Sequence, residues 1–267
     1  RDQAERIAAG APGDSAPDID EAGQDEIGDI ARALNRLVRR LAEQRDALVA
    51  YAAESSHRMR TALAAVRGSA EILREKDTPE PVRARFAARI ITESERMSAA
   101  LRDTLTLARL ESGETRLDRR DTDLAARLRE IVDALAAVAP GVAWETVGLD
   151  RPCTVALDAE RIDEAVTAVA ENAVKYAAPA GRVRLSLARD ARGIVIAAED
   201  SGRGILSAAR ERIFDRFFTT GEPLPDGTPA SGLGLAIARA IVRLHGGEIT
   251  AGASDLGGAA FTITLPE

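Results

Sequence analysis

The chain has 267 residues, a formal net charge of −7 and a pI near 5.2, so it is long enough for two compact domains. The acidic balance argues against nucleic acid as a partner, because phosphate contacts need clustered positive charge. The single cysteine, Cys153, excludes an internal disulfide and a cysteine-cluster metal site. Neither end resembles a signal peptide, and no stretch approaches the roughly 18 apolar residues of a membrane span. We therefore expect the chain as given to be soluble.

The first half predicts long helices. Residues 24–75 contain no proline and no glycine cluster, and apolar residues recur there at spacings of three and four, which is typical of a coiled coil. The apolar series is interrupted by a four-residue insertion in the heptad, which puts His57 on the outer face of the helix. His57 lies in "SSHRMRTALAAVRG" (55–68), with Arg58 directly after it. We expect this histidine to be reachable from solvent.

A second helix follows the sequence "EKDTPEPVR", with Thr78 predicted as its N-cap and Pro79 as its first helical residue. Two amphipathic helices joined by a short turn predict a hairpin. A hairpin alone cannot cover both apolar stripes, whereas two copies forming a four-helix bundle would. We therefore predict a homodimer. The apolar stripe of the second helix consists of Phe86, Ile90, Met97, Leu101, Leu105 and Ala108.

After "LESGET" the sequence alternates short strand-like runs with helical ones, which predicts a mixed α/β domain over 116–267. The strand-like runs include "RVRLSLARD", "GIVIAAED" and "AAFTITLPE", and the clearest helical run is "DAERIDEAVTAVAENAVKYA". A passage rich in Gly, Ala, Pro and Asp at 9–22 is typical of a flexible connector.

Four short motifs in this second part bear on chemistry. In "ENAVKYA", Asn172 and Lys175 share one helix face; an amide oxygen can bind Mg²⁺, and a lysine can bind phosphate. In "EDSGRGI", Asp200 ends a strand, where its carboxylate can accept a hydrogen bond from an exocyclic amino group. The glycines that follow, Gly202 and Gly204, would let the backbone approach a flat base.

The third motif, "RIFDRFF", holds Phe214, Phe217 and Phe218, which a small core cluster would also explain. In the fourth, "SGLGLAIARAIVRLHGG", Gly232 and Gly234 open an apolar helix whose N-terminus can bind an anion. Each motif alone also has an ordinary structural explanation. The order of all four makes the pattern specific.

In this order the motifs resemble the N box, the Asp-x-Gly-x-Gly box, the Phe box and the Gly-x-Gly box of sensor histidine kinases and their gyrase-type relatives. "SSHRMRTAL" resembles the phosphoacceptor box of the same family, and "DEIGDIARALN" (25–35) resembles the second helix of a HAMP linker. The resemblance predicts an α+β multidomain chain. Its expected parts are a partial HAMP and coiled-coil linker (1–44), a dimerisation and phosphotransfer hairpin (45–113) and an α/β sandwich ATP-binding domain with a mixed sheet (116–267).

The resemblance implies ATP-dependent autophosphorylation of His57, then transfer to an Asp of a response regulator receiver domain. Mg²⁺ would be held by Asn172, a phosphate by Lys175 and the adenine amine by Asp200, while Thr61 would position the water that dephosphorylates the regulator. It also implies a location at the cytoplasmic face of the cell membrane, as part of a membrane receptor. The remaining expected nucleotide-binding residues are Tyr176, Gly202, Gly204, Gly232, Leu233 and Gly234, with 219–231 as a mobile lid.

Four positions depart from the family pattern. Arg58 replaces the acid that usually follows the histidine, and a guanidinium cannot accept a proton; either another carboxylate, such as Glu54, serves as base or autophosphorylation is slow. Ala62 replaces a proline, and Ala230 replaces a glycine at the lid hinge. Ala168 replaces the water-activating Glu of gyrase-type hydrolases, which favours phosphoryl transfer over hydrolysis.

Two alternative functions stay open. One is a gyrase-type ATPase, and the other is a nucleotide-binding dimeric scaffold with weak or no kinase activity, which Arg58 favours. The second histidine, His245, precedes two glycines at a predicted helix end, where a histidine can bind terminal carbonyls. We expect His57, not His245, to be the phosphoacceptor.

Overall fold

The computed structural model describes residues 33–36, 38–39, 42, 59–75, 78–112, 115–177, 180–191, 193–219 and 231–266. The chain divides into two compact units, residues 1–93 and 94–267, and each is described by itself. His57, Arg58 and lid residues 220–230 lie outside the described residues.

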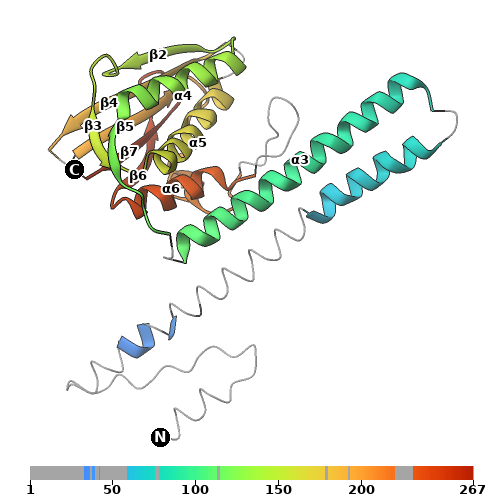
Figure 1. Cartoon of the computed structure of the whole chain (residues 1–267), viewed down its shortest axis with the longest axis horizontal. Helices are drawn as coiled ribbons and strands as arrows, with labels where there is room; N and C mark the ends of the chain where they lie inside the picture. Colours follow the sequence, from blue (N-terminus) through green and yellow to red (C-terminus); the bar gives the residue numbers. More distant parts are fainter. Residues whose placement is uncertain are drawn as a thin grey trace, which may run out of the picture. The chain divides into compact units, whose positions relative to one another are not determined.

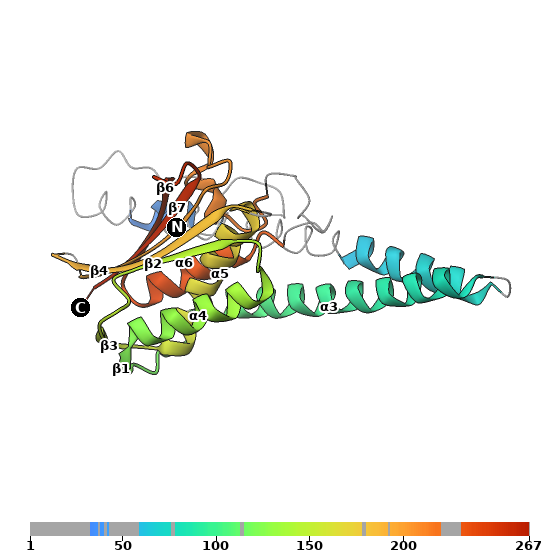
Figure 2. The same cartoon turned by 90° about the horizontal axis from the view of Figure 1, so that it is seen from above.

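The first unit contains the helical hairpin. Residues 59–74 form a helix that runs beside the first part of α3 (Glu80–Glu111), as Figures 1 and 2 both show. Near the turn, the Arg83 guanidinium donates to the carbonyl of Leu73 at 3.2 Å. The predicted hairpin is confirmed.

The capping prediction at this turn was wrong by one residue. Helix α3 begins at Glu80, and the carbonyl of Pro79 accepts the amide N–H groups of Val82 and Arg83 at 2.9 and 3.0 Å. The Thr78 hydroxyl donates to the carbonyls of Ile72 and Glu75, at 3.0 and 3.2 Å. A hydroxyl can donate as well as accept, so Thr78 binds carbonyls at the end of the preceding helix instead of capping α3.

The second unit is built on a five-stranded mixed sheet with the order β2-β4-β5-β7-β6. The β2–β4 pair is parallel and the other three pairs are antiparallel. Alternate residues of β4, β5 and β7 are buried, as the two-residue period of a half-covered sheet requires. The strands are β2 (Ala143–Val147), β4 (Arg182–Asp190), β5 (Gly193–Asp200), β6 (Glu248–Ala253) and β7 (Ala259–Leu265).

Three helices, α4 (Leu124–Val138), α5 (Ala159–Ala177) and α6 (Gly234–Leu244), cover one face of this sheet (Figure 2). Strands β1 (Arg120–Asp123) and β3 (Thr154–Leu157) form a separate antiparallel pair. Leu107 and Leu110 of α3 join the same hydrophobic core. The predicted combination of a helical hairpin and an α/β domain with a mixed sheet is confirmed.

Candidate functional site

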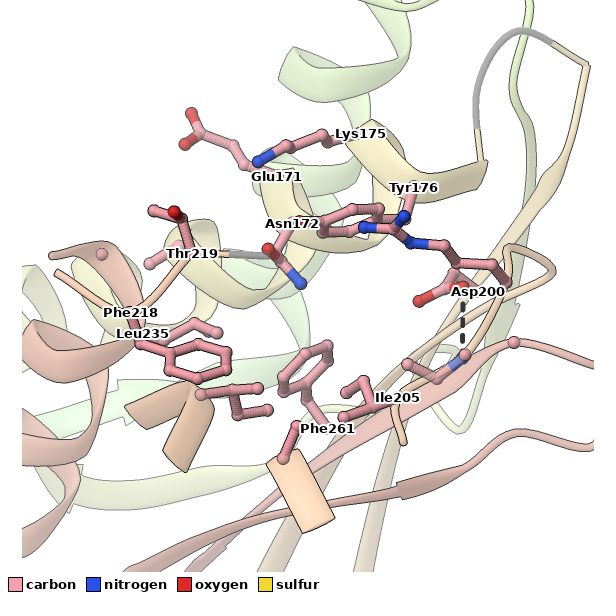
Figure 3. Close-up of a pocket in the computed structure, with 18 of the residues that line it drawn as sticks. Glu171, Asn172, Lys175, Tyr176, Asp200, Ile205, Phe218, Thr219, Leu235 and Phe261 are labelled. Atoms are coloured by element: carbon pink, nitrogen blue, oxygen red, sulfur yellow. Dashed lines mark hydrogen bonds between the residues drawn. The ribbon is translucent and has the colours of Figure 1, made fainter. Parts of the chain in front are cut away.

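A cavity of about 820 Å³ lies between α5, the end of β5, the start of β7 and the beginning of α6. Figure 3 shows Ile205, Leu235 and Phe261 on one side of it, and Lys175 and Tyr176 on the opposite side. The cavity therefore combines an apolar wall with a polar edge, where the carboxylate of Glu171 lies beside Lys175, as expected for an amphiphilic ligand.

Asp200, the last residue of β5, is fully buried in the wall of this cavity. Its Oδ1 accepts the amide N–H groups of Gly202 at 2.8 Å and Ala259 at 3.2 Å. Its Oδ2 is buried without a hydrogen-bond partner among the described residues. Burial raises the pKa of this carboxyl group, while the two amide donors lower it. A buried acceptor without a partner is costly, so Oδ2 is suited to accept an N–H from a bound ligand.

Backbone crowding around Asp200 explains why glycines surround it. A Cβ at Gly258 would lie 2.1 Å from Asp200 Oδ1, and one at Gly202 would lie 2.5 Å from the carbonyl oxygen of Tyr176. Side chains at these two positions would collide with the carboxylate or with the end of α5. The crowding fixes the carboxylate within the cavity wall.

Three of the predicted residues come from one helix. Asn172, Lys175 and Tyr176 of α5 line the cavity together, because residues three and four apart share a helix face. The Lys175 ammonium lies 4.8 Å from the centroid of the Tyr176 ring, and the Arg203 guanidinium lies 5.1 Å from it. Arg203 also lines the cavity; it stands inside the motif "EDSGRGI" but was not among the predicted binding residues.

The start of α6 closes another part of the wall. Gly232 and Gly234 line the cavity, whereas the Leu233 side chain between them is 1 % exposed and belongs to the hydrophobic core. A Cβ at Gly232 would lie 2.7 Å from Cα of Phe217, and the amide N–H of Phe217 donates to the Gly232 carbonyl at 2.8 Å. Both residues have positive φ, +67° and +58°. This close crossing joins the Phe-rich motif to the glycine motif, although 220–230 lie between them in sequence.

The structure thus brings seven of the predicted nucleotide-binding residues to one cavity and places the other two elsewhere. Gly202 lies beside Asp200 but is not part of the lining, and Leu233 packs in the core. Of the three phenylalanines, Phe214 is buried edge-on against Phe261, and Phe218 lines the cavity. The seven lining residues are Asn172, Lys175, Tyr176, Asp200, Gly204, Gly232 and Gly234.

Thr61 and His245 do not line the cavity. Thr61 is exposed on the helix of residues 59–74, in the first unit. His245 is 3 % exposed, its Nδ1 lies 2.9 Å from the carbonyl oxygen of Ile241, and its Nε2 accepts the amide N–H of Asp158 at 3.3 Å. Burial lowers the pKa of His245. With both ring nitrogens bound, His245 is a neutral structural residue at the end of α6.

Among the described residues, no cluster of three or more His, Cys, Asp or Glu side chains could hold a metal ion. The Asn172 amide fits one coordination position, and nucleotide phosphates and water would have to supply the rest, which is the usual coordination of this ion.

Comparison with known families matches three parts of the chain. Residues 157–267 match the "Histidine kinase-, DNA gyrase B-, and HSP90-like ATPase" family, residues 47–113 match the "His Kinase A (phospho-acceptor) domain", and residues 1–43 match the "HAMP domain". The domain that holds the cavity is thus an ATPase domain of this class. With its phosphoacceptor and HAMP domains, the chain belongs to the sensor histidine kinases of two-component systems.

Curated relatives of the chain are named as sensor proteins of the same family. "Probable sensor histidine kinase TcrY" of Mycobacterium tuberculosis is 32% identical over 258 residues, which cover 94% of this chain and 54% of that protein. "Sensor protein CreC" of Escherichia coli is 32% identical over 252 residues, covering 93% and 51%. The chain therefore spans about half the length of the curated relatives it matches.

Two solved structures share the fold. Full-length ShkA in complex with AMPPNP has a TM-score of 0.58 and 29% sequence identity, covering 80% of this chain and 45% of that one. The histidine kinase ThkA, in complex with a response regulator protein, has a TM-score of 0.69 and 21% identity, covering 85% and 64%; at that identity the likeness concerns the fold alone. In the part of this chain that the structure describes, no helix has the length and apolarity needed to cross a membrane.

Proposed function

We propose that the chain is the cytoplasmic region of a sensor kinase that phosphorylates His57 with ATP and passes the phosphoryl group to a response regulator Asp. The observation that carries the proposal is the buried Oδ2 of Asp200, which has no hydrogen-bond partner among the described residues, in a cavity whose opposite edge holds Lys175. That arrangement suits a ligand with an amino group at one end and negative charge at the other. Adenosine triphosphate has this chemistry.

Each cavity residue then has a definite role. Asp200 Oδ2 accepts an N–H of the adenine amino group, and Ile205, Leu235 and Phe261 provide apolar surface for the base. Lys175 neutralises phosphate charge, and Tyr176 borders the nucleotide. Asn172 holds Mg²⁺, which when bound supplies charge neutralisation at the transferred phosphoryl group.

The surroundings of Ala168 favour phosphoryl transfer over hydrolysis. Ala168 lines the cavity, and a Cβ built at Gly234 would lie 3.7 Å from its methyl group, so α5 and α6 approach closely there. An alanine cannot activate water. This favours transfer of the phosphoryl group to a side chain over its transfer to water, and His57 is the acceptor that the phosphoacceptor-domain match supports.

We further propose that the kinase is a homodimer. Leu63, Ile91, Leu101 and Leu105 of the helical hairpin are 46 to 60% exposed in a single chain. Ile91, Leu101 and Leu105 recur at near-heptad spacing along α3, and a second hairpin would cover them in a four-helix bundle. In this proposal the chain comprises a HAMP linker (1–44), the dimerisation hairpin (45–113) and the ATP-binding domain (116–267), at the cytoplasmic face of the membrane.

Regulator dephosphorylation is part of the proposal, with Thr61 holding the attacking water. Thr61 is exposed, as this role requires. One relative of Mycolicibacterium vanbaalenii, 30% identical over 282 residues, is named a "histidine-protein kinase/phosphatase". Thr61→Ala should slow dephosphorylation of the phosphorylated regulator without slowing autophosphorylation. Equal loss of both activities would contradict a role of Thr61 in positioning water.

The decisive experiment incubates the chain with Mg²⁺ and ATP carrying a radioactive γ-phosphate, beside His57→Gln and His245→Gln variants. Acid-labile, base-stable label on the wild type and His245→Gln, but not on His57→Gln, is the expected result. Label that persists in His57→Gln would exclude His57 as acceptor. Absence of label in a wild type that still binds ATP would favour the nucleotide-binding scaffold.

The same assay tests the missing acid beside the phosphoacceptor. Arg58→Glu should speed labelling if proton acceptance limits the reaction, because a carboxylate can take the imidazole proton and a guanidinium cannot. Glu54→Gln should slow labelling if Glu54 serves as the base. An unchanged rate in both variants would show that proton transfer at this position does not limit the reaction.

A further inference from the structure

The Phe-rich motif connects the end of α3 with the wall of the cavity. The Arg216 guanidinium pairs with the carboxylate of Glu111, the last residue of α3, and this contact lies within the second unit. Two residues further on, the Phe218 side chain lines the cavity (Figure 3). We propose that Glu111 is a positioning residue for the nucleotide site, which acts through Arg216 on the cavity wall. The proposal rests on the nucleotide site proposed above.

The residues on both sides of Arg216 are held by other elements. Asp215 Oδ1 accepts a hydrogen bond from the Arg239 guanidinium of α6 at 3.4 Å. The amide N–H of Phe217 donates to the carbonyl of Gly232 at 2.8 Å. Because peptide units are rigid, so short a segment cannot shift at one of these contacts without straining the others. The pair with Glu111 therefore fixes the segment together with the contacts to α6 and to Gly232.

The backbone directly after Arg216 is strained. Phe217 has a φ of +58°, in the left-handed region that residues other than glycine seldom adopt. Such a conformation persists only when its surroundings fix it. A Cβ at Gly232 would lie 2.7 Å from Cα of Phe217 and 2.9 Å from the carbonyl oxygen of Phe218, so the two backbones are in direct contact. Since Gly232 lines the cavity, a shift of Phe217 changes the cavity wall.

The last turn of α3 is a fixed support for this ion pair. Leu107, Leu110 and Glu111 share one helix face, because they lie three and four residues apart. The two leucines are buried in the hydrophobic core of the second unit. The ion pair is partly exposed, at 40% for Glu111 and 33% for Arg216, so it contributes little to stability. We therefore expect Glu111 to act on the geometry of the cavity more than on unfolding.

This contact gives the hairpin a part in nucleotide binding. Glu111 belongs to α3, which is also the second helix of the hairpin, and not to the ATP-binding domain of 116–267. If the pair shapes the cavity, a bound nucleotide must in turn stabilise the arrangement of α3 in which the pair forms, because coupling between two sites is reciprocal.

The first measurement is amide hydrogen exchange of the full chain without nucleotide. It compares the wild type, Glu111→Arg and the charge-swapped double variant Glu111→Arg/Arg216→Glu. Exchange in 212–218 should be faster in Glu111→Arg, because two like charges repel where a pair existed, and the amide of Phe217 is the reporter. The double variant should restore slow exchange. Exchange in β4 and β5 should be the same in all three proteins.

The second measurement is calorimetric binding of ADP to the same proteins and to Arg216→Glu. Each single variant should weaken ADP binding about three- to tenfold, because the pair is partly exposed, and the double variant should return to within about twofold of the wild type. Recovery in the double variant would show that the pairing matters and not the identity of either side chain.

Asp118→Arg provides a matched control for charge. It makes the same change of net charge at the exposed ion pair of Asp118 and Arg120, and neither residue is among the described residues that line the cavity. Its ADP affinity should stay within about twofold of the wild type. Equal weakening by Asp118→Arg and Glu111→Arg would overturn the proposal, because the effect would then reflect net charge alone.

Three further results would overturn it: unchanged ADP binding in Glu111→Arg, no recovery in the double variant, or weaker ADP binding with unchanged exchange in 212–218. The last result would mean that Glu111 does not act through this segment. Exchange is measured without nucleotide and histidine labelling plays no part. A wild type that fails to bind ADP would therefore contradict the proposed function, whereas unchanged exchange would contradict the role of Glu111.

Discussion

Helices α3 and α5 bury very different shares of their residues. Two of the 32 residues of α3, all of them described, are buried, and both lie near its C-terminal end. In α5, seven of 19 residues are buried, spread along the whole helix. Helix α5 packs inside a complete domain, whereas most of α3 is not covered by the residues that the structure describes.

The difference shows that the apolar faces of the two helices need different covering surfaces for stability. Helix stability in proteins comes mostly from packing of an apolar face, so a long helix with exposed leucines needs a further surface. The ATP-binding domain has that surface in its own sheet and can hold a preformed cavity. In the proposed homodimer the hairpin would obtain it from a second chain, and its geometry could then respond to changes in the dimer.

The most severe test of this comparison is to make the exposed stripe of α3 polar. Leu101→Asp combined with Leu105→Asp should raise the dimer dissociation constant by at least about a hundredfold, because carboxylates would have to be buried without partners. Light scattering at micromolar concentration measures the change in mass. The matched control is Val138→Asp on α4, whose side chain is 77% exposed and lies in the other domain; its mass should not change. A monomeric wild type would contradict the dimer proposal.

A second prediction concerns the ATP-binding domain. Gly258→Ala would place a methyl group 2.1 Å from Asp200 Oδ1, so the carboxylate or the β7 backbone must move. We expect a loss of about 1–3 kcal/mol in unfolding free energy, and weaker ATP binding through the displaced Asp200. Gly252→Ala is the control, because a Cβ at Gly252 has no atom within 4 Å. Chemical denaturation and calorimetry give the two readouts, and equal effects of both variants would show that the crowding at Asp200 is unimportant.

A third prediction concerns the pH dependence of the same domain. Because the pKa of folded His245 is lowered, mainly by burial, the unfolded state binds more protons than the folded state below about pH 6.5. The stabilisation from neutral His245 is thus complete above that pH and is lost as the pH falls. Nearby Arg119 lowers the pKa further, and the Ile241 carbonyl and Asp158 oppose the shift.

The His245 effect can be isolated because the chain has only two histidines. Denaturation of His57→Gln should show unfolding free energy decreasing from pH 7 to pH 5. The double variant His57→Gln/His245→Gln should be less stable at pH 7 and should show a smaller decrease. Carboxylates contribute equally to both variants, so identical pH slopes would exclude a buried neutral His245.

The sequence predicts the regular parts of the fold well, because burial and periodicity coincide there. The quoted strand-like runs correspond to β4, β5 and β7, and the quoted helical run contains α5. Strand β1 could not be found in this way: its sequence, Arg-Asp-Thr-Asp, has no apolar residue, and it is a strand because it pairs with β3. Tertiary pairing outweighs local propensity at such positions.

The site was predictable to the extent that its residues belong to motifs. Spacing along a helix accounts for Asn172 and Lys175, and a strand end accounts for Asp200. Leu233 was expected at the nucleotide because of its neighbours, but the start of α6 directs it into the core. Arg203 stands inside the second motif but was not predicted as a binding residue, because arginine is common in this chain: of its 36 basic residues only two are lysines. Its position on the Tyr176 ring is a property of the fold.

The smallest expected effect concerns ion pairs in both regions. The Glu111 carboxylate at the end of α3 pairs with the Arg216 guanidinium, and both side chains are partly exposed, at 40% and 33%. Glu111→Gln should lower the unfolding free energy by less than about 1 kcal/mol, and less still at high salt, because water and ions screen exposed pairs. The hairpin pair of Arg67 and Glu71, at 83% and 60% exposed, is the matched case, and Glu71→Gln should change stability even less. A loss above about 2 kcal/mol for Glu111→Gln would mean that this pair, and not only the apolar contacts of Leu107 and Leu110, fixes the end of α3 to the ATP-binding domain.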